Sequence, residues 1–199
     1  GRLCVPLVFN KSLSKANKLS EQAIKSIRSN YLDLLARFDS QERIITDKAP
    51  LNFRFIGHIL SAFPEAKIIH LKRDPVAICW SIYKSNWSGL GNSFSYNMDD
   101  LVNYYGLYEN LMRFWHQKFP DKIYDINYEK LTTHQESESK KLINYCGLDW
   151  DQNCLEFYKN TRVVKTASSL QVRQKMYQGS SEAWKEYASY LKPLIDGLS

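Results

Sequence analysis

The chain has 199 residues, of which 44% are hydrophobic and 24% charged, the composition of an ordinary globular protein large enough for one sizeable core. Its formal net charge of +6 favours anionic partners, but Lys and Arg are scattered among acidic residues, so we expect no nucleic-acid partner. No apolar stretch approaches the roughly 20 residues of a membrane span. We expect no signal peptide, a cytoplasmic protein and no membrane partner.

Hydrophobic spacing, Pro and Gly positions and capping residues predict the secondary structure of the first half of the chain. Ser20 is the expected start of the first helix, and Asn52 is expected to cap the second. In chain order we predict a helix over residues 20–38, a strand over 44–46, a helix over 52–62, a strand over 67–71 and a helix opened by Pro75.

The second half begins with a Gly/Ser/Asn-rich loop over residues 88–95. After it we predict a long helix over 98–119, a third strand over 122–127 and helices over 135–145, 152–158 and 181–194. Strands that alternate with helices, without tight hairpin signals, indicate an α/β fold with a parallel sheet flanked by helices. No repeat or linker divides the chain, so we predict a single domain over residues 1–199.

The most informative segment is the predicted strand that ends in Arg73-Asp74-Pro75, with Ser81 on the helix that follows. In α/β proteins, anionic ligands bind at the carboxyl ends of parallel strands, beside helix N-termini. Arg73 and Ser81 are therefore a candidate anion site. The alternative is a surface arginine that pairs with Asp74 and a serine on an exposed helix face.

Two further strand ends carry candidate residues. Lys48 follows the first predicted strand and could contact a transferring anionic group, although alone it would be interpreted as a solvated loop lysine. Tyr128 and Glu129 follow the third, where the tyrosine could contact a ligand and the glutamate could orient a neighbour. A tyrosine half-buried at a sheet edge is the alternative.

A polar segment over residues 166–177 lacks clear periodicity and could close over an anionic ligand. It offers hydrogen-bond donors at Ser168, Gln171, Arg173 and Lys175. The alternative is a solvated connection between two elements.

Several kinds of site are not indicated. The four cysteines form no C-x-x-C pair, and neither they nor the four histidines have ligand spacing, so we expect no metal site and reduced thiols. A disulfide between Cys146 and Cys154 remains an open alternative. No G-x-x-x-x-G-K-[ST] motif is present, which excludes ATP hydrolysis through that loop.

Five segments together resemble the sulfotransferases that use 3′-phosphoadenosine 5′-phosphosulfate, in the tyrosylprotein and tetratricopeptide-linked bacterial branch. They are DKAPLNFRFIG (47–57), FPEAKIIHLKRDPVAICWSIY (63–83), NYEKL (127–131), YCGLDWDQNCLEF (145–157) and TASSLQVRQKMY with WKEY (166–187). The resemblance implies a P-loop-NTPase-like parallel sheet, of which this chain would be the C-terminal three quarters.

The resemblance also implies the roles of individual residues. Arg73 and Ser81 would hold the 3′-phosphate of the cofactor, which leaves as adenosine 3′,5′-bisphosphate, and Tyr128 would lie beside the adenosine. Lys48 and Ser168 would be catalytic residues near the sulfuryl group. The cofactor would also be bound by Gln171, Arg173 and Lys175. The reaction would be in-line sulfuryl transfer to a hydroxyl or amine, without a metal.

The family's 5′-phosphosulfate loop lies upstream of every matched segment and is absent from this sequence. We therefore expect an N-terminally truncated domain that is inactive or weakly active as an isolated chain, with exposed strand edges that favour a homo-oligomer. The alternatives are a non-catalytic relative that binds a nucleotide or a partner, and a nucleotide kinase-like fragment. The acceptor is not predicted.

Overall fold

The computed structural model describes residues 20–37, 44–87, 92–161 and 171–199. The predictions for Ser168 and for part of the 88–95 loop lie outside these residues. The chain divides into two compact units, which are described in turn: the first contains residues up to Ile68 together with Asn110–Pro120, and the second contains Ile69–Glu109 and Asp121–Ser199. The prediction of one domain over residues 1–199 stays a prediction.

In the first unit, helix α2 (Glu21–Ala36) begins where the sequence predicts, because the Ser20 side chain accepts a hydrogen bond from the Ala23 amide. The 3₁₀ helix η1 (Pro50–Phe55) continues into helix α3 (Ile56–Ala62). Ile27, Phe55 and Ala62 are buried together and form the core of this unit.

Two predictions in this unit are wrong. Residues 44–46 form no strand in the structure, and each of them is exposed, so there is no apolar burial to favour one. Asn52 caps no helix: the N-cap of η1 is Ala49, and Pro50 occupies the first turn. A proline at the first helical position has no amide proton and a fixed φ, which places the helix start before Asn52.

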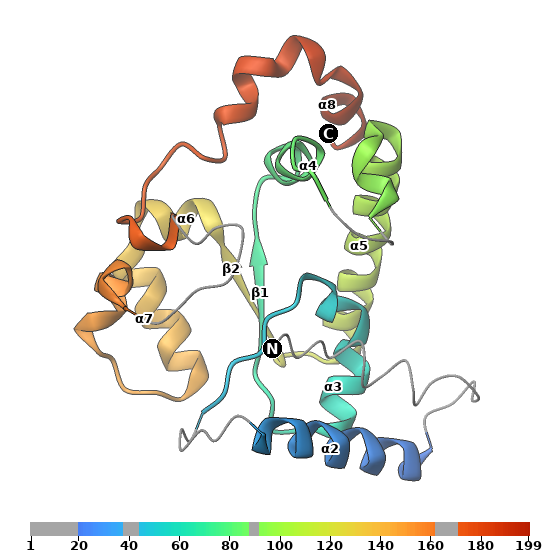
Figure 1. The fold of residues 1–199 in the computed structure, drawn as a ribbon, viewed down its shortest axis with the longest axis vertical. Helices are drawn as coiled ribbons and strands as arrows, with labels where there is room; N and C mark the ends of the chain where they lie inside the picture. The colour runs from blue at the N-terminus through green and yellow to red at the C-terminus, as the bar shows by residue number, and fades with distance from the viewer. Residues whose placement is uncertain (1–19, 38–43, 88–91, 162–170) are drawn as a thin grey trace. The chain divides into compact units, whose positions relative to one another are not determined.

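The second unit contains a two-stranded parallel sheet of β1 (Ile68–Lys72), whose first residue belongs to the other unit, and β2 (Ile123–Asn127). Helix α4 (Pro75–Tyr83), the 3₁₀ helix η2 (Ser93–Tyr96) and helix α5 (Met98–Lys118) follow β1 in the chain (Figure 1). The residues of α5 from Asn110 onward belong to the first unit. The predicted strand–helix–strand order is thus confirmed for β1, α4, α5 and β2.

After β2 the chain turns directly into helix α6 (Tyr128–Thr133), which is not among the predicted elements. Asn127 caps it by accepting a hydrogen bond from the Lys130 amide at 2.7 Å. Helix α7 (Gln135–Cys146) packs against β2, and the 3₁₀ helices η3 (Gln152–Lys159) and η4 (Gln171–Arg173) follow.

The predicted helix over 181–194 is instead a 3₁₀ helix, η5 (Ala183–Tyr190), followed by the short helix α8 (Lys192–Gly197). Pro193 lies in the first turn of α8, where its missing amide proton costs least, so the chain restarts a helix there instead of continuing one. Leu191 and Leu194 are buried with Cys79 of α4 and Leu101 of α5, which forms the main core of the second unit.

Among the described residues, no helix is long and apolar enough to cross a membrane. Cys79, Cys146 and Cys154 are free thiols, so the open alternative of a Cys146–Cys154 disulfide is not realised in the structure. Burial raises the pKa of the Cys79 thiol to about 12, with a smaller contribution from the charge of Asp74, and this thiol therefore stays protonated and acts as an apolar core residue.

Candidate functional site

The carboxyl ends of β1 and β2 bring two of the predicted site residues together. Arg73 follows β1 directly, and Tyr128 follows β2 directly. Because the strands are parallel neighbours, both residues emerge at the same edge of the sheet. The guanidinium carbon of Arg73 lies over the Tyr128 ring, 5.0 Å from its centroid, which is a cation–π contact.

The start of helix α4 is fixed beside this pair. The Asp74 carboxylate caps the helix by accepting a hydrogen bond from the Ala77 amide at 2.7 Å, and Pro75 occupies the first turn. Arg73 and Asp74 therefore do not form a surface ion pair in the described structure, because the Asp74 carboxylate caps helix α4 instead. Arg73 is left to contact other groups.

A turn that begins at Gly179 supplies those groups. Gly179 has φ +95°, a conformation that favours glycine, and its carbonyl accepts from the Glu182 amide at 2.9 Å. Arg73 donates from Nη2 to the Ser180 carbonyl at 2.5 Å and from Nε to Ser181 Oγ at 2.9 Å. The hydroxyl groups of Ser180 and Tyr128 are hydrogen-bonded at 2.9 Å.

Ser180 and Ser181 are not among the residues predicted for the site. The only local signal is the Gly-Ser-Ser run, which is typical of a turn and says nothing about which distant side chain the turn contacts.

Glu129 connects the turn to the start of α4. One of its carboxylate oxygens accepts from Ser181 Oγ at 2.6 Å and from the Asp74 amide at 3.1 Å. Burial raises the pKa of Glu129, but the hydrogen bonds from Ser181 and the Asp74 amide, together with the positive charge of Arg73, leave the pKa below its ordinary value of 4.5. The carboxylate is therefore ionised at neutral pH, and the expectation that Glu129 orients a neighbour agrees with these contacts.

The lowered pKa makes Glu129 a source of pH-dependent stability. Its contribution is fully present above the ordinary value of 4.5 and is lost as the pH falls through the lower pKa of the folded state, because the unfolded chain binds the proton first. The free energy of unfolding, measured with urea at a series of pH values below 5, should fall as the pH is lowered. We expect it to fall less steeply with pH for Glu129→Gln than for the wild type. Ser181→Ala should fall between them, whereas Ser137→Ala, on the surface of α7, should follow the wild type. Equal slopes for Glu129→Gln and the wild type would contradict the assignment.

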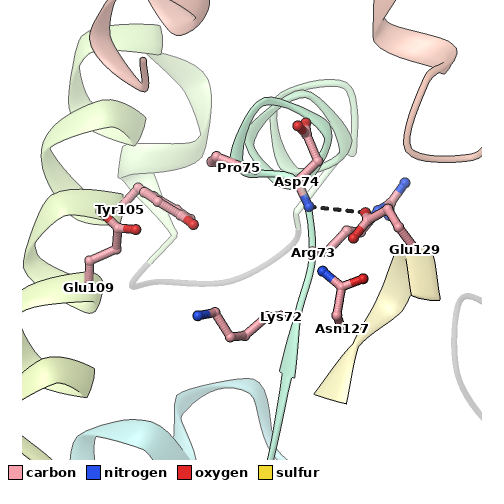
Figure 2. A pocket seen from close by; sticks show the side chains of 8 residues that line it. All are labelled: Lys72, Arg73, Asp74, Pro75, Tyr105, Glu109, Asn127 and Glu129. Carbon is pink, nitrogen blue, oxygen red and sulfur yellow. Dashed lines mark hydrogen bonds between the residues drawn. The ribbon is translucent and has the colours of Figure 1, made fainter. Parts of the chain in front are cut away.

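A pocket of about 450 Å³ lies beside Arg73 (Figure 2). Tyr105 and Glu109 line it from α5, Asn127 lines it from the end of β2, and Glu129 lines it from the first turn of α6, as Figure 2 shows. The remaining lining residues come from the segment that joins β1 to α4: Lys72, Arg73, Asp74 and Pro75. The pocket therefore combines two cations with three carboxylates at the carboxyl edge of the sheet.

Ser81 lies in the last turn of α4 and is partly exposed, and its carbonyl accepts a hydrogen bond from Ser85 Oγ at 2.7 Å. Within the described part of the chain, no hydrogen bond joins the Ser81 side chain to Arg73. Lys48 is exposed and belongs to the first unit, so its place relative to Arg73 stays a prediction. Ser168 lies outside the described residues.

The other three predicted cofactor residues are exposed and lie on or just after η4. The described residues that line the pocket beside Arg73 do not include Gln171, Arg173 or Lys175. Lys175 instead lines a second pocket, of about 350 Å³, and its ammonium lies 5.8 Å from the centroid of the Tyr158 ring. The predicted roles of these three residues are therefore not tested by the structure.

The segment that follows η4 nevertheless leads to Arg73. Beyond Lys175, the Gln178 side chain donates to the Thr132 carbonyl of α6 at 3.5 Å, and the turn at Ser180 and Ser181 then reaches the guanidinium group. The contacts with α6 and with Arg73 thus come from residues just beyond the polar segment predicted over 166–177, and whether that segment itself closes over a ligand stays a prediction.

Comparison with known proteins agrees with the resemblance seen in the sequence. A model of the sulfotransferase family matches residues 8–152. A protein of Aquifex aeolicus, itself described as uncharacterized, is 38% identical over 183 residues, which cover 91% of this chain and 24% of that protein.

An omega-hydroxy-beta-dihydromenaquinone-9 sulfotransferase of Mycobacterium bovis, and its counterpart in Mycobacterium tuberculosis, are 30% identical over 118 residues. The match covers 56% of this chain and 30% of each of those proteins. The chain therefore spans about a quarter to a third of the length of these curated relatives. Because the family model covers well over half of the sequence and includes both Arg73 and Tyr128, the chain belongs to the sulfotransferase family.

Proposed function

We propose that this protein takes part in the transfer of a sulfuryl group from 3′-phosphoadenosine 5′-phosphosulfate to a hydroxyl or amine. The observation that carries the proposal is the contact between Arg73 and Tyr128 at the common carboxyl edge of β1 and β2. A guanidinium group matches a phosphate in charge and geometry, and a tyrosine ring offers an aromatic face and a hydroxyl to a nucleoside.

In this proposal Arg73 and Ser81 bind the 3′-phosphate, and Tyr128 contacts the adenosine. The proposal also retains the sequence-based roles of Lys48 and Ser168 at the sulfuryl group, and of Gln171, Arg173 and Lys175 at the nucleotide. A fold like that of P-loop NTPases, completed by a 5′-phosphosulfate loop, belongs to the same proposal. Catalysis would rest on positioning of the two reactants and on stabilisation of the charge that develops during transfer.

The mycobacterial relatives are named for an omega-hydroxy compound. Their names support a hydroxyl group as the acceptor in this protein as well. The nearby positive charge of Lys72 and Arg73 supports an anionic donor at the sheet edge.

The proposal can be tested with adenosine nucleotides that differ only in which phosphate groups they carry. In calorimetric titrations of the 199-residue chain, we expect adenosine 3′,5′-bisphosphate to bind at least about tenfold more tightly than adenosine 5′-monophosphate, because only the first carries the phosphate assigned to Arg73. Adenosine 3′-monophosphate is the matched control and should retain most of the gain. Equal affinities for the bisphosphate and the 5′-monophosphate would overturn the proposal.

A further inference from the structure

The two hydrogen bonds that Arg73 donates to the turn use one edge of its guanidinium group. Nε and Nη2 lie on the same side of the planar fork, and they donate to Ser181 Oγ and to the Ser180 carbonyl. The opposite, end-on edge is formed by Nη1 and the second proton of Nη2, and no hydrogen bond from it to a described residue is present. Arginine binds phosphate oxygens in pairs through such an edge.

Ser181 is itself held in one orientation. Its hydroxyl has a single proton, which it donates to Glu129 at 2.6 Å, so a lone pair is left to accept from Arg73 Nε at 2.9 Å. The same carboxylate accepts from the Asp74 amide at the start of α4. Arg73, Ser181 and Glu129 therefore form a chain of hydrogen bonds in which each partner orients the next.

Contacts with Tyr128 also hold the turn and Arg73 in place. Ser180 is hydrogen-bonded to the Tyr128 hydroxyl, and the Arg73 guanidinium lies over the Tyr128 ring. The guanidinium plane is thus restrained by the turn along one edge and by an aromatic ring on one face. A long arginine side chain held in this way loses little further entropy when it binds an anion.

From this geometry we propose that Ser181 is a positioning residue that holds the side-on edge of Arg73, so that the end-on edge is presented to the 3′-phosphate of the nucleotide. Glu129 supports Ser181 in this role. The inference rests on the proposed function, since it assumes that Arg73 binds this phosphate, but the orientation of Arg73 by Ser181 can be measured without any ligand.

The first experiment is a ¹⁵N correlation spectrum of the arginine side chains in the ligand-free protein. We expect a slowly exchanging Nε–H signal in the wild type, assigned to Arg73 by its loss in Arg73→Lys. The signal should disappear in Ser181→Ala, which lacks a hydroxyl acceptor. It should persist in Ser181→Thr, which keeps one. Ser137→Ala, a serine on the surface of α7, is the matched control and should leave it unchanged.

The second experiment measures the affinity of the same variants for adenosine 3′,5′-bisphosphate by calorimetry. We expect Ser181→Ala to raise Kd about tenfold and Ser181→Thr to stay within about twofold of the wild type. Ser181→Cys keeps the size of the side chain, but its sulfur is a weak acceptor, so we expect it to raise Kd about tenfold as well. It replaces Ser181→Ala if the alanine variant is too unstable to purify.

The outcomes separate the two proposals. The positioning role is overturned if Ser181→Ala and Ser181→Cys retain both the protected Nε–H signal and the wild-type Kd while Arg73→Lys weakens binding. If instead the Nε–H signal depends on Ser181 but neither the wild type nor Arg73→Lys binds the bisphosphate, the orientation of Arg73 is supported and the proposed function fails.

Discussion

Arg73→Ala should raise the Kd for adenosine 3′,5′-bisphosphate by about a hundredfold, the largest effect on binding that we expect from one substitution. The substitution removes a pair of charge-assisted hydrogen bonds to the phosphate, and it also leaves Tyr128 without the cation that lies over its ring. Calorimetry at fixed ionic strength is the measurement, because contacts between a guanidinium and a phosphate weaken with salt.

The matched control for this prediction is Arg113→Ala. Arg113 is an exposed arginine of α5 whose Nη1 donates to Asn110, so its removal takes away the same charge at a surface position. We expect its Kd to remain within about twofold of the wild type. A Kd for Arg73→Ala that matches that of Arg113→Ala would show that Arg73 contributes no more than a surface charge, and the assignment of the 3′-phosphate to Arg73 would be wrong.

Leu194→Ala should lower the free energy of unfolding by about 3 kcal/mol, the largest stability change that we expect from a single side chain. Leu194 of α8 is 0% exposed and is buried with Leu191, Cys79 and Leu101. The truncation removes buried apolar contacts and leaves a cavity that the neighbours on α4 and α5 and the residue before α8 fill only partly. Urea unfolding followed by circular dichroism measures the change.

Leu107→Ala provides a control with identical chemistry. Leu107 of α5 is 68% exposed, so its truncation removes little buried area, and alanine is an equally good helix former. We expect its free energy of unfolding to lie within about 0.5 kcal/mol of the wild type. If the two leucine variants unfold at the same urea concentration, the core around Leu194 does not contribute to stability as the structure indicates.

The elements that could be predicted from the sequence are those with strong local signals. Ser20 starts α2, and Pro75 with its Asp74 cap starts α4. The apolar run before Arg73 forms β1 within one residue of its expected bounds. In each case a capping group, a proline or a hydrophobic pattern acts on residues within a few positions of itself, so no knowledge of the rest of the chain is needed.

The failures have a common cause. Residues 44–46 carry the β-branched pattern of a strand, but they find no partner in the described structure and stay exposed. Helix α6 was missed because its six residues are too few to show a period, and because it begins directly at the end of β2. Strand pairing and burial decide whether residues 44–46 form a strand and whether a helix begins directly after β2. Neither pairing nor burial can be predicted from a local pattern.

The sequence alone was enough to assign this protein to its family and to single out Arg73 and Tyr128 as candidate site residues. Arg73 and Tyr128 each directly follow a strand, and neighbouring parallel strands bring their carboxyl ends to one edge of the sheet. The partners of Arg73 in the candidate site became visible in the folded structure alone. Ser181 is separated from Arg73 by 108 positions and from Glu129 by 52, and the hydrogen bonds between them depend on how the chain returns to the sheet after α7. Orientation of the arginine is therefore a property of the fold, whereas its charge and its place at the strand end are properties of the sequence.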